Sequence, residues 1–176
     1  MTVDFFDLVR TRRSISAFRP APIREADRAA ILEAAARAPS AGNLQAYEID
    51  LVDDVQLREA IARAADQPFL SEAPLLLVFC AMPEQSAAKY GRRGKSLFCV
   101  QDATIACAYA QLAADALGLG CVWVGAFVPE EVARAIDAPH RAVPIAILAI
   151  GRRAEEGSIS PRRQVDELVR RPMRQR

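Results

Sequence analysis

The chain has 176 residues, 52% of them hydrophobic, and its 23 lysines and arginines nearly balance its 22 acidic residues. This length supports one substantial hydrophobic core, which predicts a single domain over residues 1–176. The balanced charge gives no excess positive field for nucleic acid or for an anionic membrane. A function on a small molecule is therefore expected, with neither nucleic acid nor a membrane as partner.

The four cysteines are expected to be buried, reduced thiols. Cys80, Cys99, Cys107 and Cys121 form no C-x-x-C pair, and His140 is the only histidine, so no metal site is predicted. The first residues lack the pattern of a secretory signal, and no apolar run approaches the roughly 20 residues that a membrane span requires. These features predict a cytoplasmic protein.

Apolar periodicity predicts alternating helices and strands. Helices are expected over residues 4–11, 25–38, 55–65, 101–117 and 129–136, and strands over residues 47–51, 75–81, 121–124 and 143–150. Residues 83–96 are mostly polar and are expected to form a long loop, which could act as a substrate lid. The alternation predicts an α/β or α+β sandwich with helices over both faces of one sheet.

Two glycine motifs do not support a nucleotide site. Gly94-Lys95-Ser96 matches the end of a phosphate-binding P-loop, but Lys89 stands where that motif requires its first glycine. Gly118-x-Gly120, followed by Gly125, comes after a helix and opens a strand, which reverses the order of a dinucleotide fingerprint. The single histidine also argues against a nucleophilic triad.

Two pairs of adjacent arginines beside serines could bind phosphate. They are Arg12 and Arg13 with Ser14, and Arg162 and Arg163 with Ser158 and Ser160. Guanidinium forks and hydroxyl groups together suit a phosphate. An arbitrary Arg-Arg pair is more often solvated surface charge, so a phosphate clamp depends on support from elsewhere in the sequence.

That support comes from the segment Pro39–Gln45, with sequence PSAGNLQ. Its small residues allow close backbone approach, and the amides of Asn43 and Gln45 offer paired donors and acceptors for the edge of a flat heterocycle. Considered alone, the segment is a turn before a strand.

Taken in order, these motifs resemble the nitroreductase family of flavoproteins over nearly the whole chain, from Phe5 to about Val169. The matching segments are Arg12–Ile15, Ala38–Gln45, Gln67–Phe69, Tyr90–Gly94, Gln101–Asp102 and Ala116–Phe127. The resemblance implies an α+β three-layer sandwich with a central mixed sheet and helices on both faces. It also implies an obligate homodimer with one FMN at each subunit interface. A helix over residues 101–117 that is apolar nearly all round points to a dimer as well.

The resemblance assigns cofactor-binding roles to three groups of residues. Arg12, Arg13 and Ser14, with Arg162 or Arg163, would hold the phosphate and ribityl chain. Pro39, Ser40, Ala41, Asn43 and Gln45 would come from the other subunit, and Trp123, Val124, Gly125 and Ala126 would cover the reactive edge of the flavin. A backbone amide of Gly125 or Ala126 would lie near flavin N5, and no catalytic side chain is expected.

The sequence departs from the family pattern at three places. Ser16 stands where the family often has a cation near flavin N1 and O2, so either the redox potential is lower here or another cation takes that place. Ala46-Tyr47 replace the usual Pro-Trp after Gln45, which changes the pocket wall. Gly151-Arg152-Arg153 replace the usual Gly-Tyr-Pro after the last strand.

The implied activity is an FMN-dependent oxidoreductase. Electrons would pass from NADH or NADPH to nitroaromatic, quinone or related acceptors by a ping-pong mechanism. The alternatives are a flavin-dependent dehydrogenase or reductive dehalogenase on the same scaffold, a non-catalytic flavin-binding protein, and an unrelated domain without flavin. The sequence leaves open the physiological acceptor and the choice between NADH and NADPH.

Overall fold

A computed structural model describes residues 3–139 and 141–172 of the chain. The helices are α1 (Phe5–Thr11), α2 (Glu25–Ala36), α3 (Val55–Ala64), α4 (Pro83–Arg93), α5 (Cys99–Ala116), α6 (Pro129–Ala135) and α7 (Val165–Leu168). The strands are β1 (Phe18–Arg19), β2 (Tyr47–Val52), β3 (Leu75–Ala81), β4 (Gly120–Val124) and β5 (Val143–Arg153). Short 3₁₀ turns span Ala41–Asn43 and Pro68–Glu72, and a π-helical turn, Gly94–Phe98, leads into α5.

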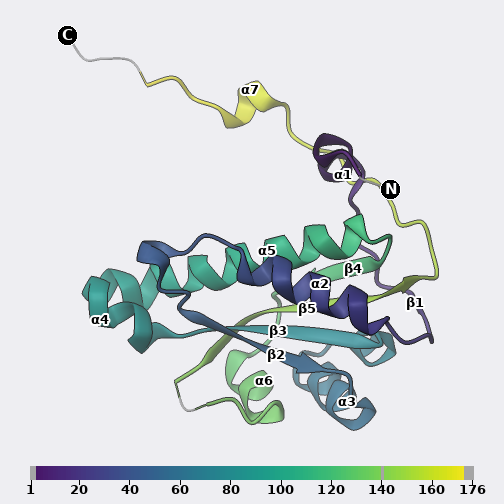
Figure 1. Ribbon diagram of the computed structural model, residues 1–176, viewed down its shortest axis with the longest axis horizontal. Coiled ribbons are helices and arrows are strands. Elements are labelled where there is room, and N and C mark those ends of the chain that lie inside the picture. Colours follow the sequence, from purple (N-terminus) through teal and green to yellow (C-terminus); the bar gives the residue numbers. More distant parts are fainter. Residues whose placement is uncertain (1–2, 140, 173–176) are drawn as a thin grey trace.

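The molecule is a three-layer sandwich, as the sequence predicts (Figure 1). Helices α2 and α5 cover one face of the sheet, and α3 and α6 cover the other. Strands β3 and β5 form the centre, with β2 beside β3 and with β1 and β4 beside β5. All pairings between these strands are antiparallel, so the expected mixed character is confined to one isolated parallel bridge between Ser14 and Cys121.

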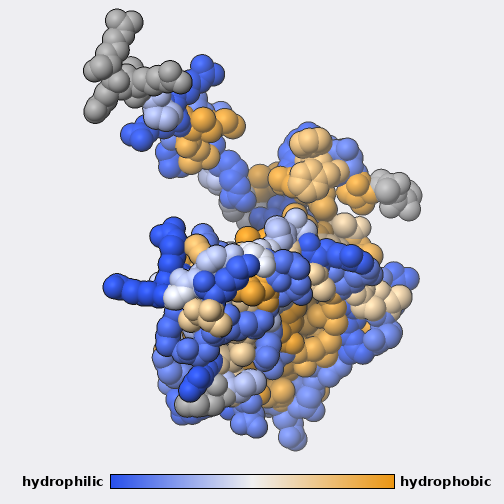
Figure 2. All heavy atoms as spheres, turned by 60° about the vertical axis from the view of Figure 1, so that its left-hand side comes forward, coloured by the Kyte–Doolittle hydropathy of each residue, from blue (hydrophilic) through white to orange (hydrophobic). Residues whose placement is uncertain are grey.

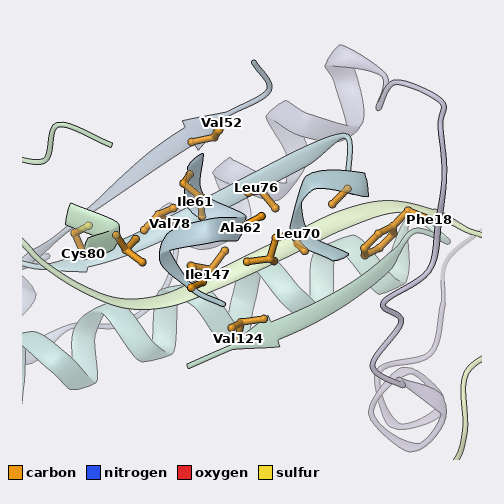
Figure 3. Close-up of a cluster of buried hydrophobic side chains, with 14 of the residues drawn as sticks. Phe18, Val52, Ile61, Ala62, Leu70, Leu76, Val78, Cys80, Val124 and Ile147 are labelled. Carbon is orange, nitrogen blue, oxygen red and sulfur yellow. The ribbon is translucent and has the colours of Figure 1, made fainter. Parts of the chain in front are cut away.

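Strand β3 shows how the sequence builds both halves of the core. All seven of its residues are buried, because a strand covered on both faces carries apolar side chains without alternation. Leu76, Val78 and Cys80 point toward α3 and α6, where Figure 3 shows them with Ile147 of the neighbouring strand. Leu75, Leu77 and Phe79 point the other way, toward α2 and α5.

The expected loop over residues 83–96 is wrong: most of it is the helix α4, followed directly by the π-helical turn. Pro83 occupies the first turn, where its missing N–H costs nothing. The helix packs closely at Gly94, where a Cβ atom would lie 2.4 Å from the carbonyl oxygen of Ser86. Its polar composition reflects an exposed helix at the periphery, which the sequence pattern did not distinguish from a loop.

Helix α5 is the central element of one face. Ala103, Ala106, Cys107, Ala110 and Ala114 are fully buried against α2 and the sheet. The continuous segment Pro83–Ala116 is also long and apolar enough to cross a membrane by length and composition, a test that the core helix of a folded domain passes too. Only 39% of its most apolar window is buried inside the subunit. Much of this apolar helix is therefore available to a further contact.

The chain after β5 forms an extended arm, residues 154–172. Figure 1 shows it running past α1 and away from the body of the molecule. Its side chains are almost all exposed, including those of Ile159, Val165, Leu168 and Val169. The arm is otherwise mostly charged and polar, so these four apolar side chains have no core of their own and a second surface would be needed to cover them.

Candidate functional site

The two arginine clusters predicted to bind phosphate meet in space. A small cavity of about 140 Å³ is lined by Val9, Arg10, Arg12, Arg13, Ser14, Ser158, Ile159, Ser160 and Arg162. The residues after α1 bring one cluster, and the arm after β5 brings the other. Arg163 does not line the cavity, because its guanidinium donates to the carbonyl oxygen of Glu167 at 2.8 Å. Of the two late arginines, only Arg162 lines this cavity.

The guanidiniums in this cavity carry donors without acceptors. Arg12 Nη1 and Arg13 Nε are buried and have no hydrogen-bond partner among the described residues. Arg13 makes one long bond, from Nη1 to the carbonyl oxygen of Glu156 at 3.3 Å. Buried polar groups are normally satisfied, and an unsatisfied one costs about 1–3 kcal/mol. Convergent arginine donors and serine hydroxyls fit the phosphate of an FMN.

A buried carboxylate, that of Asp115, lies within the electrostatic influence of Arg12 and Arg13. Asp115, in the last turn of α5, has only 7% of its side chain exposed and accepts a hydrogen bond from Arg153 Nη2 at 2.6 Å. Burial raises the pKa of the Asp115 carboxyl, while the nearby positive charges of Arg153, Arg12 and Arg13 act to lower it. The sequence analysis assigned no role to Asp115 or Arg153, because residues 38 apart in the chain show no pairing signal.

The segment Pro39–Gln45 is held in one shape by a second buried carboxylate. Asp102, 2% exposed, accepts from the backbone N–H of Ala41 at 2.8 Å and of Ala46 at 3.4 Å. Within the segment, Ser40 Oγ accepts from the backbone N–H of Gln45 at 2.9 Å. Asp102 is part of the segment Gln101–Asp102 that carried the family resemblance in the sequence, but only the structure shows which backbone amides it binds.

The amide side chains of this segment lie on its outer surface. Asn43 and Gln45 are exposed and have positive φ angles of 58° and 49°. Gln45 Nε2 also donates to Asn43 Oδ1 at 3.4 Å. Positive φ is uncommon outside glycine, and such strain often marks a functional site. The arrangement leaves both side chains at the surface of the subunit.

An apolar cavity of about 460 Å³ adjoins the segment. Its lining comes from Pro39, Ser40 and Ala41 together with Phe98, Val100, Gln101, Asp102, Thr104 and Ile105 around the start of α5. Helix α4 is tied to the same segment, because Gln85 Nε2 donates to the carbonyl oxygen of Leu44 at 2.8 Å. The structure thus brings Pro39, Ser40 and Ala41 to a cavity wide enough for part of a small molecule.

The third predicted group lies at the end of β4. Trp123 is half-buried and Val124 is buried, whereas Gly125 and Ala126 are exposed in the following loop. A Cβ atom at Gly125 would lie 3.7 Å from Trp123 Nε1, so the indole lies next to this exposed backbone. Ser16 is also exposed, in the segment that leads from the arginine cluster to β1.

These groups do not all meet within one chain. The arginine cavity adjoins Asp115 at the end of α5, and the segment Pro39–Gln45 adjoins Asp102 near its start. At about 1.5 Å of rise per residue, the two acids are roughly 20 Å apart along the helix axis. A site built from both ends with contributions from two copies of the chain would account for this separation.

Two other features contain no residue of the predicted cofactor site. A larger cavity, about 740 Å³, lies between the segment Pro20–Ile23 and α3, and its Arg28 is paired with Asp53 at 2.7 Å. The Gly94-Lys95-Ser96 motif lies in the π-helical turn, where Lys95 Nζ pairs with Glu84 at 2.5 Å. Among the described residues, no group of His, Cys, Asp and Glu could hold a metal ion.

Comparison with known proteins identifies relatives along most of the chain. The sequence model of the Nitroreductase family matches residues 9–67 and 61–152. A protein of Thermus thermophilus named NADH dehydrogenase is 33% identical over 187 residues, which cover 90% of this chain and 91% of that protein. An FMN reductase (NAD(P)H) of Bacillus subtilis is 31% identical over 166 residues, covering 85% of this chain and 66% of that protein.

A solved structure confirms the likeness in three dimensions. An FMN-dependent nitroreductase from Clostridium difficile R20291 superposes with a TM-score of 0.77 at 25% identity, covering 89% of this chain and 92% of that one.

Proposed function

Because the chain belongs to the nitroreductase family, we propose that it is an FMN-dependent oxidoreductase that passes electrons from NADH or NADPH to nitroaromatic, quinone or related acceptors. The observation that carries the proposal is the cavity between α1 and the arm, where the guanidiniums of Arg12 and Arg13 hold buried donors without acceptors. A terminal phosphate satisfies these donors, which favours FMN over a flavin that lacks a terminal phosphate.

Different residues of the chain would bind different parts of the cofactor. Arg12, Arg13 and Arg162 would bind the phosphate, with hydroxyls from Ser14, Ser158 and Ser160. The exposed backbone at Gly125 and Ala126 would face the flavin ring. Bound FMN supplies the hydride-accepting chemistry, so the protein is required to bind, orient and tune it rather than to provide an acid or base.

A homodimer would complete the site. Nine of the exposed apolar side chains lie on three elements: α1 (Phe5, Phe6, Val9), α5 (Val100, Tyr109) and the arm (Ile159, Val165, Leu168, Val169). Figure 2 shows this hydrophobic colouring as a broad area on the body and again on the projecting segments. A second copy would bury these surfaces and place its Ser40, Asn43 and Gln45 beside the flavin held by the first.

Two further properties follow from the proposal. The four cysteines are free and buried, which suits a reducing compartment, and we propose that the protein acts in the cytoplasm. The residues expected to form a lid, 83–96, are ordered as a helix and the start of a π-helical turn, and Phe98 at the end of that turn lines the apolar cavity. A dehydrogenase or dehalogenase on the same scaffold would use the same cofactor contacts and differ in the acceptor that this helix admits.

The first experiment identifies the flavin and then removes one phosphate contact. Purified protein should release FMN, not FAD, and the bound flavin should be reduced anaerobically by NADH or NADPH. Arg12→Ala should weaken FMN binding by about 1.5–3 kcal/mol, a loss of roughly 10- to 150-fold, because it removes a charge-assisted contact. Arg171→Ala, on the exposed arm, is the matched control. The sequence also predicts little effect of Arg174→Ala on FMN binding, but Arg174 lies outside the described residues. Equal losses in both variants would place the phosphate elsewhere.

A further inference from the structure

Arg153 reaches from the end of β5 to the buried Asp115 at the end of α5. Its Nη2 donates to Asp115 Oδ1 at 2.6 Å, and Nε and Nη2 donate to the carbonyl oxygen of Leu119 at 3.2 and 3.1 Å. The side chain passes closely over Gly120, where a Cβ atom would lie 2.9 Å from Arg153 Cγ. Three donated hydrogen bonds and this close packing fix the position of the guanidinium.

The Asp115–Arg153 pair lies beside the segment Arg12–Ile15, which carries the arginines proposed to bind the phosphate. The hypothetical Cβ of Gly120 would also lie 2.8 Å from Ile15 Cγ2, and the backbone N–H of Ile15 donates to the carbonyl oxygen of Cys121 at 2.9 Å. Residues 12–15 therefore run directly past the Asp115–Arg153 pair. In agreement, the charges of Arg12 and Arg13 influence the pKa of the Asp115 carboxyl.

The positive charges of Arg153, Arg12 and Arg13 all act on the Asp115 carboxylate, yet only the guanidinium of Arg153 is hydrogen-bonded to it in the described part of the chain. Arg12 Nη1 and Arg13 Nε are buried and have no hydrogen-bond partner within residues 3–139 and 141–172. A buried carboxylate strongly favours a bound cation, so a free Asp115 would draw in one of these two side chains. The pairing with Arg153 is the feature that prevents this.

Building on the proposed function, we propose that Arg153 is a positioning residue, which occupies Asp115 and thereby keeps the guanidiniums of Arg12 and Arg13 free for the flavin phosphate. Without Arg153, Asp115 would compete with the phosphate for the same donors and would repel it as a like charge. With Arg153 present, the four arginines Arg12, Arg13, Arg153 and Arg162 together with Asp115 carry a net charge of +3. That charge complements the −1.5 to −2 that a phosphate monoester carries at about neutral pH.

The test compares FMN with riboflavin, which has the same ring and ribityl chain but no phosphate. Both are titrated into the full-length chain after removal of its bound flavin, and binding is followed by flavin fluorescence. The variants are Arg153→Met, Asp115→Asn and the double variant, with Arg153→Lys as the conservative change. Arg152→Met, at the exposed neighbouring position, is the control.

The proposal requires a specific pattern of affinities. Arg153→Met should weaken FMN at least tenfold, the equivalent of about 1.4 kcal/mol, and should change riboflavin by less than about threefold. The double variant should bind FMN within about threefold of the unmodified chain, because it removes the competing carboxylate together with its partner. The FMN affinity of Arg153→Lys should fall between those of Arg153→Met and the double variant, since an ammonium keeps the positive charge but lacks the paired donors of a guanidinium.

Each alternative outcome refutes a separate claim. Equal weakening of FMN and riboflavin in Arg153→Met, or a double variant no better than that single variant, would reduce Arg153 to a structural role and overturn the inference. An unmodified chain that binds FMN no better than riboflavin would instead overturn the phosphate site, and with it the proposed function. If Arg153→Met does not fold, the ratio of FMN affinity to riboflavin affinity in the Arg153→Lys variant and in the double variant distinguishes these outcomes.

Discussion

Replacing Asp102 by asparagine should loosen the segment Pro39–Gln45 without filling or emptying space. The carboxylate of Asp102 is 2% exposed and accepts from two backbone amides, those of Ala41 and Ala46, at 2.8 and 3.4 Å. Asparagine has one acceptor oxygen, so one buried N–H would lose its partner at a cost of about 1–3 kcal/mol. The other bond would lose its charge assistance, and burial of a neutral amide in place of a carboxylate offsets part of the total.

We therefore expect Asp102→Asn to lower the free energy of unfolding by about 2 kcal/mol, which for a chain of this size lowers Tm by roughly 4–8 °C. Denaturant titration measures the stability, and amide hydrogen exchange at Ala41 and Ala46 should speed up more than exchange in β3. Asp166→Asn, on the exposed helix α7, is the control. A loss below about 0.5 kcal/mol with unchanged exchange at both amides would refute this account of how the segment is held.

Three further predictions concern other parts of the fold. Gly42→Ala should cost about 1–2 kcal/mol of stability, because φ is +56° and the new Cβ would lie 2.3 Å from Tyr90 Oη; Gly118→Ala, with a similar φ and open space, should cost less. The native protein should not react with Ellman's reagent between about pH 7 and 9, since burial raises the pKa of Cys121 to about 12 and all four thiols are buried; rapid reaction of one thiol would contradict the packing. Phe6→Ser, at a side chain 71% exposed in the single chain, should shift sedimentation toward the monomer and release flavin, whereas unchanged sedimentation would exclude α1 from the interface.

The elements of the fold were largely predictable because they depend on local patterns. The apolar run Leu75–Ala81 predicted a strand covered on both faces, and β3 has those bounds. The helix expected over residues 55–65 also forms, and Asp54 caps it by accepting from the backbone N–H of Leu57 at 2.8 Å. The error over residues 83–96 has the same origin, since an exposed helix with few apolar residues has no clear period to detect.

Local sequence patterns identified the chemical groups available to bind a phosphate and a flavin: two arginine clusters with serines, and a segment of small residues with amides. Which of these groups lie next to one another depends on tertiary packing. The path of the arm after β5 brings Arg162 to Arg12 and Arg13, while Arg163 turns to Glu167. The positions of the two buried acids, Asp102 and Asp115, were likewise invisible in the sequence. A carboxylate's partners are set by which backbone amides and guanidiniums the packed sheet and helices bring within about 3 Å of it, and local sequence patterns do not encode those long-range contacts.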